Sequence, residues 1–249
     1  MVFIPKIAGA SVECFCWAWY DRLREAFMNI FLLLAILFAA LEALALWKYW
    51  LRLEYIAKPA VMIILFIWLL TSTGLSGATL WFGVGIIFSL TGDVLLMLSL
   101  DRFFLFGLVA FLLAHVAYVI GFNIPLPAFS VWGIVFAVMI SLGGARIIRR
   151  IVDALASKGQ ARMRIPIIVY SMVISIMLLS AMLKLMDITW GATAAVLISG
   201  GAFLFYISDI ILAWNKFVAP IQHGRNYNIA AYHLGQIMLI AGVIAQFGK

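Results

Sequence analysis

Charged side chains are scarce in this sequence. They make up only 11% of its 249 residues, whereas 67% of the residues are hydrophobic. A soluble globular domain carries about 25% charged residues, because its surface has to face water. A chain with so little charge leaves more apolar surface than a soluble fold can bury. The composition therefore excludes an ordinary soluble domain and indicates an integral membrane protein.

Cysteine and histidine are rare as well. Cys14 and Cys16, the only two cysteines, lie too close together to close a useful disulfide loop, and the pair alone makes a poor metal site. A zinc-dependent membrane hydrolase would need three ligands that converge on one metal. The three histidines, His115, His223 and His233, leave this as an alternative, but their spacing gives it no support. We therefore expect no metal and no cofactor.

Long apolar runs, in contrast, fill most of the chain. A helix needs about 20 apolar residues to cross a hydrocarbon core of ~30 Å. Eight runs approach this length: residues 27–47, 56–73, 78–98, 103–121, 129–148, 165–185, 190–214 and 229–246. Several connections between them are short, and no long linker separates two domains. The sequence predicts an all-α fold, a polytopic transmembrane bundle of about eight helices in residues 26–249.

Residues 1–25 precede the first run and form a separate segment. They lack a clean apolar core followed by a small-residue cleavage site, so they do not resemble a cleaved signal peptide. Their Trp and Phe residues interleave with charges, which is typical of a helix lying at the membrane interface. A flexible extension is the alternative interpretation.

The placement of Lys and Arg predicts the orientation. Most of these 17 residues follow the first, third, fifth and seventh runs, with the densest group in the Arg146–Arg164 loop. The positive-inside rule then places this loop in the cytoplasm and both termini outside. Membrane-facing loops account for the net charge of +7, so we expect a bilayer and no nucleic acid as partner. The short loops favour a bacterial inner membrane over an endoplasmic reticulum, while the oligomeric state stays open.

Only three of the ten acidic residues, Glu42, Asp93 and Asp209, fall inside the predicted spans. An unpaired charge at this depth costs ~2.5–3.5 kcal/mol even on a lenient scale, so such residues are functional candidates. Asp93 and Asp209 each lie about 8 Å inside the end of an odd-numbered run, at one depth and in one leaflet. In the alternative interpretation, each aspartate only accepts a hydrogen bond that holds two helices together.

The two aspartates also lie in similar segments. Residues 88–103 read FSLTGDVLLMLSLDRF and residues 205–217 read FYISDIILAWNKF. In each, a small residue precedes the aspartate, and a basic residue plus Phe closes the segment. Histidines follow at similar distances, at His115 and His233. The offset is close to half the chain, which predicts two four-helix repeats related by an axis along the membrane normal; chance similarity of apolar segments is the alternative.

With these motifs the sequence resembles the YhhN-like lysoplasmalogenases, a family of eight-helix membrane hydrolases. The resemblance rests on Lys58–Pro59, GDVLLM at residues 92–97, AHVAY with His115 and Tyr118, GAFLFYISDIILAWNKF at residues 201–217, and YHLGQ with Tyr232 and Gln236. It implies hydrolysis of the vinyl ether bond of a lysoplasmalogen-type lysophospholipid, which releases a fatty aldehyde and a glycerophospho-base.

The chemistry of that reaction suits two aspartates. A vinyl ether is cleaved when its β-carbon takes a proton from a general acid. The resulting oxocarbenium ion is stabilised by a carboxylate and trapped by water, as in glycosidases. We therefore predict Asp93 and Asp209 as the catalytic residues, although the sequence does not say which one donates the proton.

Six further residues are predicted to bind the substrate: Lys58, His115, Asn215, Lys216, Tyr232 and Gln236. The lysines, with Asn215, would hold a headgroup phosphate, although snorkelling is the commoner use of such lysines. His115 would orient an acid, but we estimate that it lies about 10 Å deeper than the aspartates, so a helix-packing role is equally open. Tyr232 and Gln236 lie one turn apart and could order a water molecule.

A lipid or small-solute transporter or flippase is the alternative from another class. Such a protein would also use buried acids in a repeated bundle, but it favours helices broken by Gly or Pro at the midplane in both halves. We expect Pro59 and Pro166 at the starts of helices, where proline is tolerated. This placement argues against the transporter.

Overall fold

The computed structural model describes residues 30–99, 102–127 and 129–248, and these residues are helices joined by short connections. Eight of these helices are long and apolar enough to cross a membrane. They are the first helix (Ile30–Lys48), α2 (Leu51–Thr73), α3 (Ala78–Leu98), α4 (Phe104–Phe122), α5 (Val131–Ser157), α6 (Arg164–Leu183), α7 (Ala192–Ala213) and α8 (Gly224–Phe247). The predicted all-α, multi-pass membrane fold is confirmed, while the segment 1–25 lies outside the described residues.

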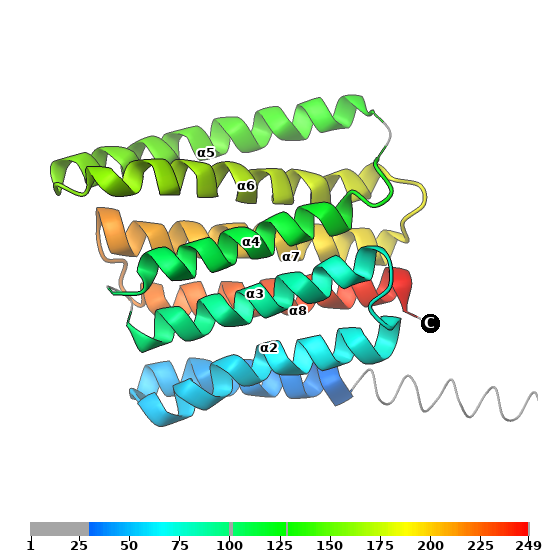
Figure 1. The fold of residues 1–249 in the computed structure, drawn as a ribbon, viewed down its shortest axis with the longest axis horizontal. Helices are drawn as coiled ribbons and strands as arrows, with labels where there is room; N and C mark the ends of the chain where they lie inside the picture. The colour runs from blue at the N-terminus through cyan, green and yellow to red at the C-terminus, as the bar shows by residue number, and fades with distance from the viewer. Residues whose placement is uncertain (1–29, 100–101, 128, 249) are drawn as a thin grey trace, which may run out of the picture.

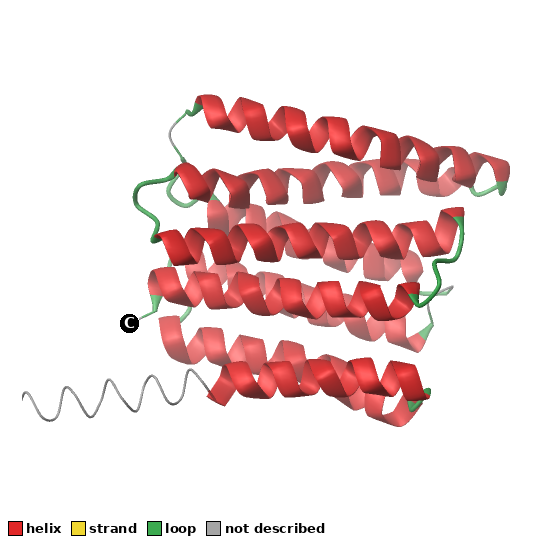
Figure 2. Ribbon diagram, turned by 180° about the vertical axis from the view of Figure 1, so that it is seen from behind, coloured by secondary structure: helices red, strands yellow, loops and turns green. Residues whose placement is uncertain are grey.

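The helices form a bundle whose connections gather at its two ends (Figure 2). α3, α5 and α7 all run in the same direction, so their carboxyl ends lie together, at the left of Figure 1. Short one-turn elements extend three of the connections: η1 (Ala161–Met163), η2 (Lys184–Met186) and the π-helical η3 (Trp214–Val218).

Two predicted boundaries need correction because helices continue past the end of an apolar run. α5 was expected to end at residue 148 but runs to Ser157, so most of the predicted Arg146–Arg164 loop is helical. Its last turns are amphipathic: Ile151 and Leu155 are buried while Arg149 and Arg150 are exposed. A prediction from apolar runs ends near the first charged residues, although the helix itself continues through them.

Pro59 was expected at a helix start, and this expectation is wrong. α2 begins at Leu51, so Pro59 lies inside the helix. The helix nevertheless continues unbroken through it, because membrane helices tolerate the loss of one backbone hydrogen bond where neighbouring groups compensate. The continuity of α2, rather than the position of the proline, therefore disfavours a transporter with broken helices.

The helix pairs follow the two-fold pattern of the predicted repeat. α3 packs on α4 as α7 packs on α8, α2 on α3 as α6 on α7, and α4 on α6 as α8 on α2. Each contact maps onto its counterpart after a shift of four helices. Glycine permits the closest approach: a Cβ atom at Gly201 would lie 2.6 Å from the carbonyl oxygen of Gly235. The same holds for Gly85, whose added Cβ would lie 2.1 Å from the Tyr118 ring.

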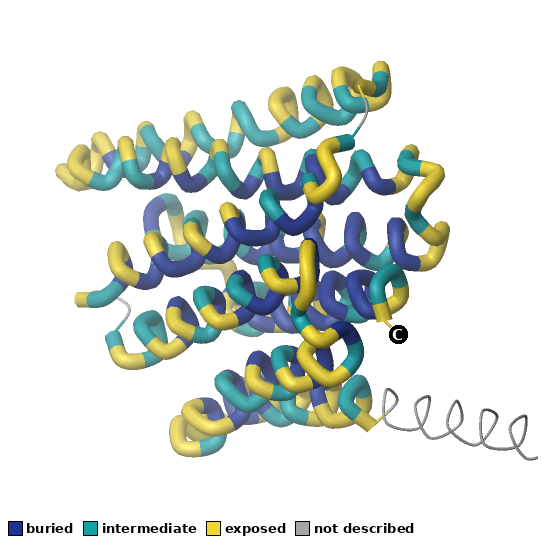
Figure 3. The backbone as a smooth tube through the Cα atoms, turned by 45° about the vertical axis from the view of Figure 1, so that its right-hand side comes forward, coloured by how far each residue is buried: buried dark blue, intermediate teal, exposed yellow. Residues whose placement is uncertain are grey.

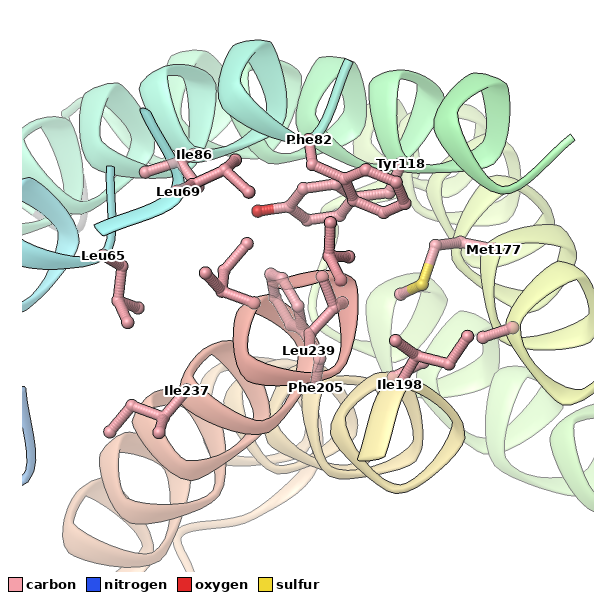
Figure 4. Close-up of a cluster of buried hydrophobic side chains, with 14 of the residues drawn as sticks. Leu65, Leu69, Phe82, Ile86, Tyr118, Met177, Ile198, Phe205, Ile237 and Leu239 are labelled. Carbon is pink, nitrogen blue, oxygen red and sulfur yellow. The ribbon is translucent and has the colours of Figure 1, made fainter. Parts of the chain in front are cut away.

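The apolar core lies between these two halves. Phe82 and Tyr118 from α3 and α4 face Phe205 and Leu239 from α7 and α8 (Figure 4). Buried residues concentrate in the central helices, whereas α5 is mostly exposed along its length (Figure 3). α5 therefore forms the outer wall of the bundle, and the space behind it contains the candidate site.

Candidate active site

Asp209 lies at the centre of a three-residue cluster built by α4, α6 and α7. The Tyr170 hydroxyl donates a hydrogen bond to Asp209 Oδ2. His115 Nε2 lies 3.3 Å from the same oxygen and 3.0 Å from the Tyr170 hydroxyl. Within the described part of the chain, Oδ1 of Asp209 has no hydrogen-bond partner, and the side chain is 13% exposed. One carboxyl oxygen is thus held by the protein and the other is open.

His115 is fully buried, and its Nδ1 has no hydrogen-bond partner among the described residues. Its Nε2 contacts both the Tyr170 hydroxyl and Asp209 Oδ2. The ring is therefore joined to the Asp209 centre through one of its two nitrogens.

A cavity of about 430 Å³ opens in front of the Asp209 carboxyl group. Asp209 is the one charged side chain among its lining residues in the described chain, and the other polar side chains are Ser141, Ser171, Ser175, Tyr170 and Tyr206. The remaining wall is apolar. The cavity therefore has the two features that acid catalysis on a lipid needs: a carboxyl group with an open oxygen, and dry, apolar surroundings.

The cavity extends to an apolar cluster near the carboxyl ends of α5 and α7. Phe104, Ile151, Leu155, Ile167 and Phe217 form a small apolar cluster there, and the rings of Phe104 and Phe217 pack edge to face with centroids 5.3 Å apart. α5 is held to the bundle mainly at this cluster.

Asp93 lies in a second centre, built by α2, α3 and α8. Its Oδ1 is 3.1 Å from Lys58 Nζ, and its Oδ2 accepts a hydrogen bond of 2.6 Å from the Tyr232 hydroxyl. The side chain is only 1% exposed and does not line the cavity. Both oxygens of Asp93 are therefore occupied, and its charge is compensated by a lysine.

Aromatic rings connect the two centres. The Tyr232 ring packs against Phe205 with centroids 5.3 Å apart, and the His115 ring lies 4.7 Å from Phe205 on the side of the other centre. Phe111, which lines the cavity, contacts both Tyr232 and Phe205. This aromatic layer therefore connects Asp93 to the Asp209 centre.

The two centres use equivalent helices. Asp93 on α3 takes its partners from α2 and α8, and Asp209 on α7 takes its partners from α6 and α4. A shift of four helices converts one set into the other. The side-chain clusters therefore follow the same repeat as the helix pairs.

Glu42, the third acid inside a span, is also paired. It accepts a hydrogen bond from His233 Nε2 on α8, and both residues are buried. Every acid predicted inside a span thus has a partner, as the cost of burying a lone charge in a membrane requires.

None of the six predicted binding residues is among the described residues that line the cavity, and four of the six lie in surroundings of their own. Lys58 is buried against Asp93 and not at the membrane surface. Gln236 donates to Ser89 and accepts from Tyr118 in the core. Asn215 Oδ1 accepts from the backbone N–H of Ile221 and so shapes the turn before α8.

The Tyr232 hydroxyl donates to Asp93, while Gln236 is bonded to Tyr118 and Ser89. Lys216 Nζ lies 4.7 Å from the centre of the Phe104 ring, which places it beside the apolar cluster that the cavity reaches. Of the six residues, Lys216 is the one whose position suits a headgroup next to the cavity.

His115 was estimated to lie about 10 Å deeper than the aspartates, and this estimate is wrong. The span containing Asp209 does not end at residue 214, because the π-helical η3 extends it to Val218. Asp209 therefore lies about 14 Å inside the end of its span, close to the depth of His115 on α4. The two side chains consequently meet.

Sequence reasoning missed Tyr170, which donates to Asp209. Tyrosine belongs to no catalytic motif here, so Tyr170 is absent from the predicted site residues. A usable signal exists: Tyr170 is the sole tyrosine in the run 165–185, on the helix that corresponds to α2 in the repeat. A hydroxyl at that position is the counterpart of Lys58.

The fold and the two centres define a polytopic membrane protein with a carboxyl group exposed in a membrane-embedded cavity. The comparisons give this class a family. The sequence model of the YhhN family matches residues 53–243, so the chain belongs to the YhhN family, as the motifs around Asp93 and Asp209 suggested. All residues of both centres lie within the matched range, and Glu42 lies outside it.

Curated relatives carry the name lysoplasmalogenase. The chain is 25% identical over 193 residues to lysoplasmalogenase TMEM86B of Mus musculus, which covers 77% of this chain and 74% of that protein. It is 28% identical over 165 residues to lysoplasmalogenase TMEM86A of Homo sapiens, covering 65% of this chain and 64% of that protein. No solved structure matches the chain.

Proposed function

We propose that this chain hydrolyses the vinyl ether bond of lysoplasmalogen-type lysophospholipids and that Asp209 is its general acid. One observation carries the assignment of the acid: among the described residues, Asp209 is the one charged side chain that lines the membrane-embedded cavity. The family and the names of the relatives support the reaction class.

In the first step, the protonated Asp209 transfers its proton from Oδ1 to the β-carbon of the vinyl ether. The C–C double bond supplies the electron pair for the new C–H bond, and an oxocarbenium ion forms at the adjacent carbon. The carboxylate produced by the step then faces the cation and stabilises it.

In the second step, water adds to the oxocarbenium carbon and returns a proton to Asp209. The hemiacetal that results collapses to the fatty aldehyde and the free hydroxyl of the glycerophospho-base. Tyr170 and His115 both contact Oδ2, so they hold the carboxylate with Oδ1 directed to the cavity. The acid is regenerated in each cycle, and the net reaction consumes one water molecule.

Asp93 has a positioning role in this proposal. Its ion pair with Lys58 holds the Tyr232 hydroxyl, and the Tyr232 ring supports Phe111 and Phe205 behind the cavity. The expectation that two aspartates act together thus becomes a division of labour: Asp209 transfers the proton, and Asp93 fixes the wall.

The headgroup is proposed to lie outside the cavity, near Lys216. No Lys or Arg lines the cavity itself within the described residues, whereas Lys216 lies against Phe104, one of the lining residues. A phosphate there would leave the vinyl ether, the group next to the glycerol, closest to Asp209.

The purified protein should be incubated with three lysophospholipids that differ only at the first chain: a vinyl ether, a saturated ether and an ester. The proposal predicts aldehyde from the vinyl ether alone, because only that bond forms an oxocarbenium ion on protonation of carbon. Release of fatty acid from the ester with no aldehyde from the vinyl ether would contradict it.

A further inference from the structure

α5 stands away from the bundle over most of its length. Its buried residues, Ile151 and Leu155, both belong to the apolar cluster near its carboxyl end. Towards its amino end α5 diverges from α6 and is largely exposed (Figures 1 and 3). This arrangement leaves space between α5 and α6 on the membrane side.

A second cavity of about 620 Å³ occupies that space. It continues the first one along both helices: on α6 the lining passes from Ile176 to Leu179 and Leu183, and Ser141 on α5 lines both cavities. Small residues, Gly133 and Ala137, line the α5 side. The two cavities therefore adjoin at Ser141, and together they mark the course of the groove considered below, which begins at Asp209.

The groove has the length and the chemistry of a lipid chain site. Gly144 lies at the level of the Tyr206 hydroxyl, one turn from Asp209, and from there to residue 130 α5 rises by about 21 Å. One leaflet accounts for about half of the ~30 Å hydrocarbon core, or ~15 Å. The groove is therefore long enough for a whole chain, and no charged residue lines its second part within the described residues.

We propose that this groove binds the single alkenyl chain of the substrate, which enters sideways from the bilayer between α5 and α6, and that Ala137 limits the chain length. The inference rests on the proposed function for its reacting end, because Asp209 marks where the vinyl ether lies. We assign the alkenyl chain as the occupant because the groove continues from the Asp209 site and has an apolar lining.

The test fills the groove at its middle with Ala137→Phe and compares two vinyl ether lysolipids, one with a full-length chain and one with about half of that length. Excluding part of an apolar chain from a pocket costs ~1–3 kcal/mol, a factor of about 10–200. We expect kcat/KM for the long chain to fall by at least about tenfold, with the short chain unchanged; the latter also shows that the variant is folded. Equal effects on both chains, or no effect on the long one, would overturn the inference.

Val135→Phe is the matched control. Val135 is on the same helix, is exposed and lines neither cavity. A phenyl ring at this position therefore adds bulk outside the groove. Its kcat/KM should equal that of the wild type for both chain lengths. A loss at Val135 as large as that at Ala137 would also overturn the inference, because it would show a general effect of bulk on α5.

A binding measurement separates this inference from the proposed reaction. The wild-type protein is photolabelled with a saturated ether lysolipid that carries a photoreactive group at the end of its chain. Labels are expected on residues 130–141 and 179–183, even if no vinyl ether is hydrolysed. Labels elsewhere, or complete displacement by an equal amount of two-chain phospholipid, would show that the groove is not a site for this chain.

Discussion

The Asp93 and Asp209 centres have the same arrangement, in which an aspartate contacts a tyrosine and one further side chain. That further side chain is Lys58 at Asp93 and His115 at Asp209. In both, an aspartate on the third helix of a repeat meets side chains from two equivalent helices. Asp93 meets a lysine and a tyrosine and does not line the cavity, whereas Asp209 meets a tyrosine and a histidine and keeps one oxygen open.

This difference separates a structural carboxylate from a reactive one. Asp93 pairs with a lysine at 3.1 Å, and breaking a buried ion pair of this kind leaves an uncompensated charge. Asp209 has no Lys or Arg partner among the described residues, so a proton can be gained or lost there without leaving a lysine unpaired. One repeat thus supplies rigidity, and the other supplies proton transfer.

Asp209→Asn should have the largest effect on turnover. The amide keeps the shape and can still accept from Tyr170, but it cannot donate a proton to carbon. General acids contribute ~10²–10⁴-fold, so kcat for aldehyde release should fall by about that factor with the fold retained in detergent. Asp153→Asn, at an exposed position on α5, is the control and should be fully active. Wild-type kcat in Asp209→Asn would remove Asp209 from the mechanism.

Tyr170→Phe should have the next largest effect. The change deletes the hydroxyl that donates to Asp209 Oδ2, and hydrogen bonds to charged groups contribute ~1.5–3 kcal/mol. We expect kcat to fall by about 10–100-fold with KM nearly unchanged. Tyr118→Phe removes a hydroxyl bonded to Gln236 and should leave kcat intact. Similar kcat losses in both variants would point to general loss of packing rather than to support of Asp209.

Changes at the Asp93 centre should affect stability more than turnover. Asp93→Asn or Lys58→Met leaves one buried charge unpaired, which costs ~3–5 kcal/mol and should lower the melting temperature in detergent. The double variant removes both charges and should recover much of the loss. In folded protein, kcat should stay within about tenfold of the wild type. Stable single variants without activity would show that Asp93 acts in the chemistry itself.

Removal of divalent metal should have no effect on activity, which makes it the smallest of the expected effects. Within the described residues, His115 belongs to the Asp209 centre and His233 pairs with Glu42, while His223 is exposed before α8. A metal would have to draw these separate residues together. Activity with and without a chelator should therefore be equal, and a loss that zinc restores would favour the zinc-hydrolase alternative.

The sequence predicted the helices well because lipid makes apolar length a strong signal. Residues 78–98 were predicted with the bounds that α3 has. The helix ends beyond the first charges were not predictable in the same way, since α5 and η3 continue through polar residues. The error of nine residues at the end of α5 shows how far an amphipathic helix can leave the apolar region.

The candidate site was predictable only in part. Asp93, Asp209 and the repeat that relates them follow from cost and pattern, because a carboxyl group in an apolar run has few explanations. The division between the two aspartates depends on tertiary contacts: Lys58 was expected at the surface, and Tyr170 was not expected at all. The positions of Lys58 and Tyr170 depend on which neighbouring helix each side chain faces. Hydrophobic periodicity does not specify which helices are neighbours in a bundle.

The most direct test follows the proton itself. Wild-type protein, Asp93→Asn and Asp209→Asn are each incubated in heavy water with the vinyl ether lysolipid, and the aldehyde is reduced at once and analysed by mass. The account predicts that wild type and Asp93→Asn yield product with deuterium on the carbon next to the former aldehyde, and that Asp209→Asn yields almost none. Labelled product from Asp209→Asn at the wild-type rate, or unlabelled product from the wild type, would contradict it.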